Sequence, residues 1–98
     1  MGWASHHIEK LRQGETVSFR PTGNSMRGRV ASGDLCTVVP VAGREVRVGD
    51  IVLCTVQGRQ YLHLVRAIRQ GRYQIGNAHG GINGWTAAIH GVCVRVEP

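Results

Sequence analysis

The sequence predicts a mainly β domain with a compact, partly closed sheet and one short N-terminal helix. After residue 14, short apolar runs alternate with polar residues, which is the side-chain period of a β-strand. Glycine-containing turns separate these runs roughly every eight to twelve residues, a spacing typical of small β-sheet domains. Only residues 3–13 show helical spacing. At 98 residues, the chain is predicted to form one domain, residues 1–98, with a single core.

The N-terminal segment, residues 1–14, is expected to hold the helix. Ala4, Ile8 and Leu11 recur at i, i+4 and i+7, which places them in one apolar stripe. Gly14 follows directly and is a typical C-terminal stop. We therefore expect a short amphipathic helix that packs on a β core formed by residues 15–98.

The strands are expected where β-branched and apolar residues cluster between turns. Residues 15–20 alternate and end at Pro21, which has no N–H to donate to a neighbouring strand. By contrast, residues 77–86 contain repeated glycine and asparagine, so this segment is predicted to be a tightly turned loop instead of a strand. The other predicted strands are residues 35–39, 51–56, 61–68, 73–76 and 89–96.

The chain is basic, with a formal net charge of +6. Lys10 is the only lysine, and the other basic residues are arginines. This excess favours an acidic partner, such as nucleic acid or an anionic protein surface, although a solvated arginine-rich surface has the same composition. No run of five or more like charges exists, so a disordered basic arm is not predicted.

The three cysteines, Cys36, Cys54 and Cys93, lie far apart in apolar, strand-like runs. Free cysteine in such a run behaves as a small hydrophobe. A disulfide framework or a zinc site would need closer cysteine pairs. We therefore predict reduced, largely buried thiols, a reducing compartment, and no metal or cofactor.

The sequence has no stretch of eighteen consecutive apolar residues, and its N-terminus lacks the apolar segment of a signal peptide. These features predict a cytoplasmic protein without a membrane segment. The oligomeric state is not predicted by any feature of the sequence.

The residues Gly23-Asn24-Ser25-Met26 are the first candidate for a functional site. Gly23 and Asn24 favour a tight turn, because glycine adopts positive φ and asparagine bonds to its own backbone. A serine on such a turn projects its hydroxyl from the backbone, as a nucleophile requires. The same residues also form ordinary turns. Ser25 is therefore a candidate nucleophile only in combination with the motifs that follow it.

Those motifs occur in a defined order. Gly33-Asp34 and Gly49-Asp50 each precede a predicted strand, and Tyr61-Leu62-His63 lies in a later one. The ordered set, over residues 15–97, resembles the peptidase domain shared by LexA-type repressors and type I signal peptidases. In that superfamily a Ser-Met box carries the nucleophile. The resemblance therefore implies a LexA-like or signal-peptidase-like fold, a peptide or protein substrate, and Ser25 as nucleophile. The absence of a predicted membrane segment favours the LexA-type branch.

The resemblance gives two alternatives for the general base. LexA-type domains use a lysine, and aligning their strand here places Arg66 at the lysine position, where arginine keeps its proton and cannot act as a base. Signal peptidases of the eukaryotic and archaeal type use a histidine, and the corresponding alignment places His63 there, 38 residues after Ser25. His63 and Arg66 point to opposite faces of a regular strand, so only one alignment applies.

These motifs lead to two hypotheses for the function, one enzymatic and one of binding. A third alternative is that the Ser25 region has no relation to catalysis. The first is a stand-alone serine peptidase in which Ser25 attacks, His63 transfers the proton, and backbone N–H groups of the turn bind the oxyanion. The second is an inactive, peptidase-like module that binds an anionic partner. Gly28 stands where the superfamily commonly has a proline, which reduces the rigidity of the turn. The residues assigned to the turn or oxyanion site are Gly23, Asn24 and Met26, and those assigned to anion binding are Arg27, Arg29 and, in the second function, Arg66.

Overall fold

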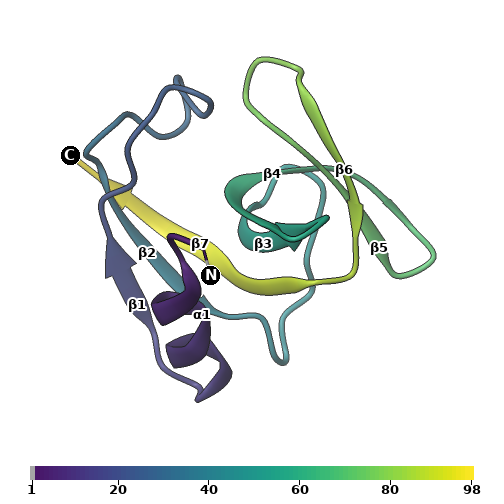
Figure 1. Ribbon diagram of the computed structural model, residues 1–98, viewed down its shortest axis with the longest axis horizontal. Helices are drawn as coiled ribbons and strands as arrows, with labels where there is room; N and C mark the ends of the chain where they lie inside the picture. The colour runs from purple at the N-terminus through teal and green to yellow at the C-terminus, as the bar shows by residue number, and fades with distance from the viewer. Residues whose placement is uncertain (1) are drawn as a thin grey trace.

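The computed structural model describes residues 2–98 and contains one helix and one antiparallel sheet (Figure 1). The predicted class, mainly β with one short N-terminal helix, is confirmed, and the sheet is not closed into a barrel. In chain order the elements are α1 (Ser5–Arg12), β1 (Val17–Phe19), β2 (Leu35–Pro40), β3 (Ile51–Val56), β4 (Arg59–Arg69), β5 (Arg72–Gly76), β6 (Ile82–Thr86) and β7 (Ile89–Glu97).

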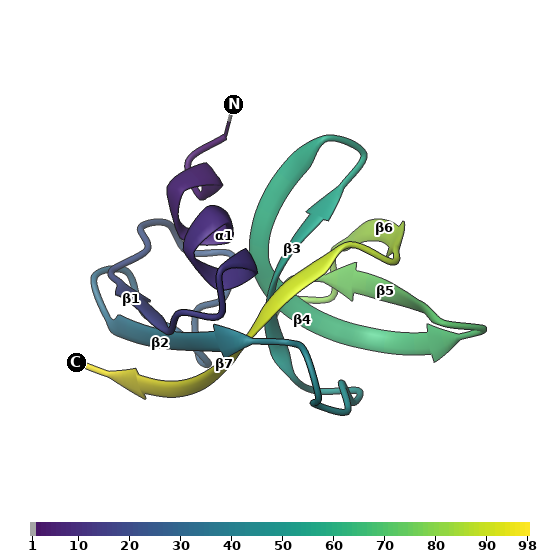
Figure 2. The ribbon, with the colours of Figure 1, turned by 90° about the horizontal axis from the view of Figure 1, so that it is seen from below.

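The sheet has the strand order β1-β2-β7-β3-β4-β5-β6. The last strand in the sequence, β7, therefore lies between β2 and β3 and joins a small two-stranded part to a larger four-stranded part (Figures 1 and 2). The pairing of β7 shifts between Thr37 and Val38 on one side and between Leu53 and Cys54 on the other. Such irregularities increase local twist, in agreement with the strong curvature of the sheet.

Two clusters of buried side chains lie on opposite faces of the central strands. Alternate residues of a strand point to opposite faces, so Leu62 and Leu64 of β4 belong to one cluster and Val65 to the other. The cluster of Leu62 and Leu64 lies beneath α1, which contributes Leu11 and the preceding Ala4. The predicted apolar stripe is thus confirmed, with Ile8 partly buried against the same cluster.

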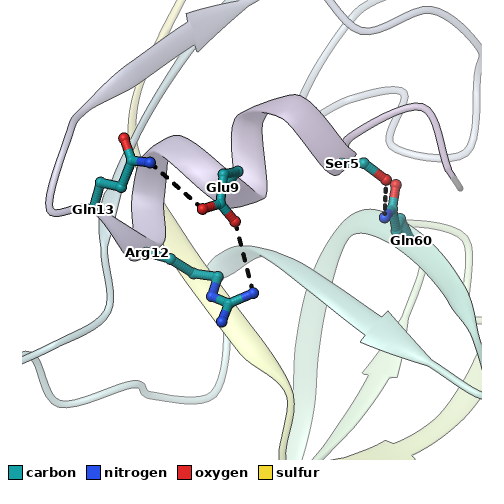
Figure 3. Close-up of polar contacts among 5 residues, drawn as sticks. All are labelled: Ser5, Glu9, Arg12, Gln13 and Gln60. Carbon is teal, nitrogen blue, oxygen red and sulfur yellow. Dashed lines mark hydrogen bonds and ion pairs between the residues drawn. The ribbon is translucent and has the colours of Figure 1, made fainter.

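The N-terminus of α1 is bound to the hairpin of β3 and β4 by Gln60. The Gln60 amide nitrogen donates to Ser5 Oγ (3.0 Å), as drawn in Figure 3, and the amide oxygen accepts from the Ala4 N–H (2.7 Å). The Trp3 indole also donates to the Gln60 carbonyl oxygen (3.0 Å). On the outer side of the helix, Glu9 contacts Arg12 and Gln13 (Figure 3). One side chain therefore fixes the position at which the helix begins.

The two Gly-Asp motifs form the same kind of turn. In each, glycine has positive φ (+87° at Gly33, +95° at Gly49), and the next aspartate accepts the N–H of the residue three positions before it. Both aspartate oxygens lie 2.8 Å from that nitrogen. Aspartate favours such turns because its carboxylate bonds to nearby backbone. Each motif thereby orients the chain just before β2 or β3.

The prediction of a loop across residues 77–86 is wrong, because Ile82–Thr86 forms β6. Glycine and asparagine usually weaken strands, but β6 is at the edge of the sheet and pairs only with β5. Its pairing shifts so that Ile75 faces Gly84 and Gly76 faces Ile82, which leaves Asn83 as the extra residue of a β-bulge. Gly84 has a φ of +137°, which favours glycine.

The three cysteines are free; Cys36 and Cys54 are buried, while Cys93 is half-buried. The prediction of largely buried thiols thus holds for two of the three. Burial raises the pKa of both Cys36 and Cys54 to about 12, so these thiols stay protonated and unreactive at neutral pH. Within residues 2–98, the single helix is far too short to cross a membrane.

Candidate active site

Ser25 lies on an irregular turn that follows β1. Its neighbour Met26 and, further on, Val30 are buried in the core, whereas Ser25 itself is exposed. The turn is closed by Met26, whose carbonyl oxygen accepts the N–H groups of Arg29 (2.9 Å) and Val30 (2.7 Å). The Ser25 carbonyl accepts the N–H of Ala78 (2.9 Å), which links this turn to the loop before β6. Two buried anchors thus hold the exposed hydroxyl in a defined position.

His63 lies in the middle of β4, opposite Val52 of β3. Its side chain is 8% exposed, and its ring lies 4.9 Å from that of Tyr61. The Nε2 atom of His63 is 3.0 Å from Ser25 Oγ. The two residues that the sequence proposed as nucleophile and base are therefore in hydrogen-bond contact, and the rigid central strands of the sheet hold the imidazole.

Asn83 completes the group and was not among the residues selected from the sequence. Its Oδ1 atom lies 2.7 Å from His63 Nδ1. An amide oxygen only accepts, so Nδ1 carries the proton and Nε2 presents its lone pair to the Ser25 hydroxyl. The bulge in β6 turns the Asn83 side chain toward β4, a common role of bulges beside functional sites. The only sequence signal for it was the Asn-Gly pair at 83–84, which equally indicates a turn.

The environment of His63 favours the neutral imidazole. Burial lowers the pKa of His63 below its ordinary value of 6.5, and the hydrogen bond to Asn83 offsets part of this effect. The imidazole is consequently unprotonated at neutral pH and able to accept a proton from Ser25.

The turn also presents backbone donors beside the Ser25 hydroxyl. In the part of the chain that the structure describes, the N–H groups of Ser25 and Met26 donate to no backbone or side-chain acceptor. Of the other predicted turn residues, the Gly23 N–H donates to Ser32 Oγ (3.3 Å), whereas the Asn24 carbonyl accepts from Arg27 N–H (3.1 Å) and the Asn24 N–H has no acceptor among the described residues. Among the predicted turn residues of the described chain, the free donors are thus at Asn24, Ser25 and Met26, whereas the Gly23 N–H is bonded within the turn.

Arg66, the alternative occupant of the base position, lies elsewhere. The pairing of β4 with β5 shifts between Val65 and Ala67, so Arg66 is the extra residue of a second bulge and is exposed. Together with Arg29 it lines a cavity of ≈ 310 Å³, which we call the arginine cavity. Ser25 contacts His63, and Arg66 belongs to this separate cavity. Arg27 is exposed on the turn. The other residues lining the arginine cavity are Val48, Gly49, Leu64 and Val65.

A second cavity of ≈ 200 Å³ lies where α1 meets the segment before the Ser25 turn. Its walls are aromatic: the ring of Phe19 stacks on His7 at 4.4 Å and meets Trp3 edge-on at 5.6 Å. Arg20, Pro21 and Thr22 line the remainder. Cavities therefore adjoin the chain both before and after Ser25.

The other histidines are held by different partners. His90 Nε2 contacts Thr55 Oγ1 (2.8 Å) between neighbouring strands, and His79 Nε2 contacts the Asn24 carbonyl oxygen (3.2 Å). Among residues 2–98, no three His, Cys, Asp or Glu side chains gather as a metal site would require. Within the described residues, His63 is thus the histidine that forms a hydrogen bond with a serine hydroxyl, that of Ser25.

No protein-family model and no curated protein matches this sequence. The functional interpretation therefore depends on the geometry of Ser25, His63 and Asn83, together with the order of motifs in the sequence.

Proposed function

We propose that this domain is a serine peptidase in which Ser25 is the nucleophile, His63 the general base and Asn83 the residue that orients His63. The observation that carries the proposal is the continuous pair of hydrogen bonds from Ser25 Oγ to His63 Nε2 (3.0 Å) and from His63 Nδ1 to Asn83 Oδ1 (2.7 Å). A serine hydroxyl is a weak nucleophile until a base within hydrogen-bond reach accepts its proton.

The reaction follows from these contacts. Ser25 Oγ attacks the carbonyl carbon of the peptide bond while its proton passes to His63 Nε2. The negative charge that develops on the carbonyl oxygen is stabilised by the N–H groups of Ser25 and Met26. His63 then gives the proton to the departing amine, and the carbon–nitrogen bond breaks, leaving an acyl group on Ser25. Water, activated by His63 in the same way, releases the acyl group as a carboxylic acid and restores the serine.

Asn83 has a different role from the aspartate of many serine hydrolases. Its amide oxygen fixes the imidazole tautomer, but it carries no charge to stabilise the imidazolium that forms during the reaction. We therefore expect a functional but modest catalyst whose His63 is neutral over a wide pH range.

The first prediction concerns the nucleophile. Wild-type protein should be acylated or phosphonylated at Ser25 by a serine-directed covalent probe, and Ser25→Ala should abolish labelling as measured by intact-mass spectrometry. His63→Ala should slow labelling by about 10²–10⁴-fold, the usual contribution of a general base. Ser18→Ala is the matched control, because Ser18 is on β1 and bonds to Thr37 (3.2 Å), away from His63.

The same experiment separates this proposal from the inactive binding module. Circular dichroism of each variant establishes that the β fold is intact. A folded wild-type protein that neither reacts with the probe at Ser25 nor cleaves any member of a peptide library would contradict the peptidase proposal.

A further inference from the structure

We infer that the arginine cavity is a subsite for a carboxylate of the peptide substrate, an inference that rests on the proposed peptidase function. Arg29 and Arg66 enter the cavity from two different elements, the Ser25 turn and the bulge of β4. Guanidinium groups bind carboxylates through paired, charge-assisted hydrogen bonds. Two of them around one small cavity therefore favour an anionic ligand.

The arginine cavity is lined by residues of the same turn and the same strand that carry the catalytic residues. Leu64, which lines it, follows His63 in β4, so the two Cα atoms are about 3.8 Å apart. Arg29 belongs to the same turn as Ser25, and its N–H is bonded to Met26. A substrate whose carbonyl group lies at Ser25 would thus place a nearby residue within reach of this cavity.

The Arg29 side chain is bonded to backbone that lines the same cavity. Its Nη2 atom donates to the Gly49 carbonyl oxygen (3.2 Å), which uses one of the five guanidinium N–H groups. Gly49 belongs to the second Gly-Asp turn, and its N–H donates to the Val65 carbonyl oxygen of β4 (2.8 Å). The side chain is therefore partly ordered before any ligand binds.

The chain supplies no counter-charge to these arginines. Within residues 2–98 the ion pairs are Arg12–Glu9, Arg47–Glu45 and Arg95–Glu97, and none includes Arg29 or Arg66. Both aspartates of the chain accept backbone N–H groups instead, Asp34 Oδ2 from Ala31 and Asp50 Oδ2 from Arg47 (2.8 Å each). The positive charge of the arginine cavity is thus available to a ligand.

The size and the walls of the cavity favour a single side chain over a nucleic acid. Its ≈ 310 Å³ is at the lower end of ligand-pocket volumes. Val48, Leu64 and Val65 provide apolar surface for the methylene stem of an acidic residue. Nucleic-acid binding instead depends on many phosphate contacts spread over a surface. The shared chemistry is a carboxylate, supplied by a Glu or Asp side chain or by a C-terminus.

The test measures binding to the Ser25→Ala variant, so that it does not depend on cleavage. Blocked glutamate (N-acetylglutamate N-methylamide) is titrated into ¹⁵N-labelled protein while the Nε–Hε signals of the arginines are followed. Arg29 and Arg66 should shift in a saturable way, and blocked glutamine should produce no shift. N-acetylglycine, which carries only an α-carboxylate, distinguishes a C-terminus from an acidic side chain. The shifts should weaken as salt is raised, since screening shortens the reach of charge to about 3 Å at 1 M.

Variants of the two arginines give the quantitative part of the test. Arg66→Gln and Arg29→Gln should each weaken binding by roughly three- to tenfold, as expected for the loss of one partly exposed charged hydrogen-bond partner. Arg72→Gln, which removes the same charge from an exposed site on β5, is the matched control and should bind as tightly as its parent. Equal weakening in all three variants would overturn the inference, as would shifts of Arg29 and Arg66 with oligothymidylate but with neither carboxylate probe.

A parallel cleavage experiment distinguishes this inference from the peptidase proposal. In a peptide library with Glu or Gln at each position, wild-type protein should prefer Glu at one position near the cleaved bond, and Arg66→Gln should lose that preference. Saturable binding without any cleavage would contradict the peptidase function while keeping the carboxylate site. Cleavage without a preference for Glu, Asp or a free C-terminus would contradict the site alone.

Discussion

At the scale of single residues, burial and the contact with Asn83 set how His63 ionises. Burial lowers the pKa of the imidazole from its ordinary value of 6.5, and the hydrogen bond to Asn83 raises it again in part. Activity that requires neutral His63 should therefore rise with pH through a titration below 6.5 and be constant at neutral pH. Burial of His63 thus extends the active range toward acid.

The prediction for this residue compares Asn83→Asp with Asn83→Ala. A carboxylate 2.7 Å from Nδ1 would favour the imidazolium, so Asn83→Asp should raise the pKa of His63 and move the rising part of the pH–rate profile to higher pH. Asn83→Ala should lower the rate at every pH, because the imidazole is no longer oriented. The rate of Ser25 labelling against pH measures both effects. An unchanged profile in Asn83→Asp would contradict the assigned role.

At the scale of elements, β7 passes close to both β2 and α1 at Gly91. A Cβ atom on Gly91 would lie 2.6 Å from Val38 Cγ1, 2.7 Å from the Val39 carbonyl oxygen and 3.1 Å from Leu11 Cδ1. Real Cβ atoms do not approach backbone this closely, so a side chain here would force β7 away from its neighbours. The missing side chain lets the helix pack directly on the central strand.

Gly91→Ala should consequently lower the free energy of unfolding by about 1–3 kcal/mol, the usual cost of overpacking a core. Val94→Ala is a control on the same strand; Val94 is 50% exposed, so its replacement should cost less than about 1 kcal/mol. Urea unfolding of the three proteins measures the difference. Equal stability of Gly91→Ala and the wild type would show that the strand can shift without cost.

The sequence predicted those strands whose local composition differs from that of a loop, and it missed the strand whose composition does not. β3 was predicted with its exact ends because residues 51–56 form an apolar run between two turns. The order of the sequence motifs led to Ser25 and His63 as a pair, and the two side chains are in contact. β6 and Asn83 were missed, since a bulge at a sheet edge is composed of the same glycine and asparagine as a loop. Pairing across the sheet, which local composition does not encode, decided between these structures.

At the scale of the whole molecule, three histidines make folding sensitive to acid. Burial is the main cause of the lowered pKa of His7, His63 and His90, with smaller contributions from His6 and Lys10 at His7 and from Arg12 at His90. The unfolded chain therefore binds protons more readily than the folded one as pH falls below 6.5. Protonation then favours unfolding.

The free energy of unfolding should accordingly be constant between about pH 7 and 8 and should decrease as pH falls through 6.5 toward the lower pKa values of the folded state. Urea unfolding at a series of pH values measures this. His90→Gln, which keeps a side chain able to bond to Thr55, should show a shallower decrease than the wild type. A stability that rises on acidification over this range would contradict the prediction.

The central position of β7 also determines when the two parts of the sheet are joined during synthesis. The ribosome makes this nine-residue strand after every other strand of the described chain. Until it emerges, the two strands on either side of the Ser25 turn and the strands that carry His63 and Asn83 share no strand pairing, because β7 alone pairs with both β2 and β3. If Ser25 acts as proposed, a nascent or prematurely terminated chain therefore stays latent until β7 joins the two parts of the sheet.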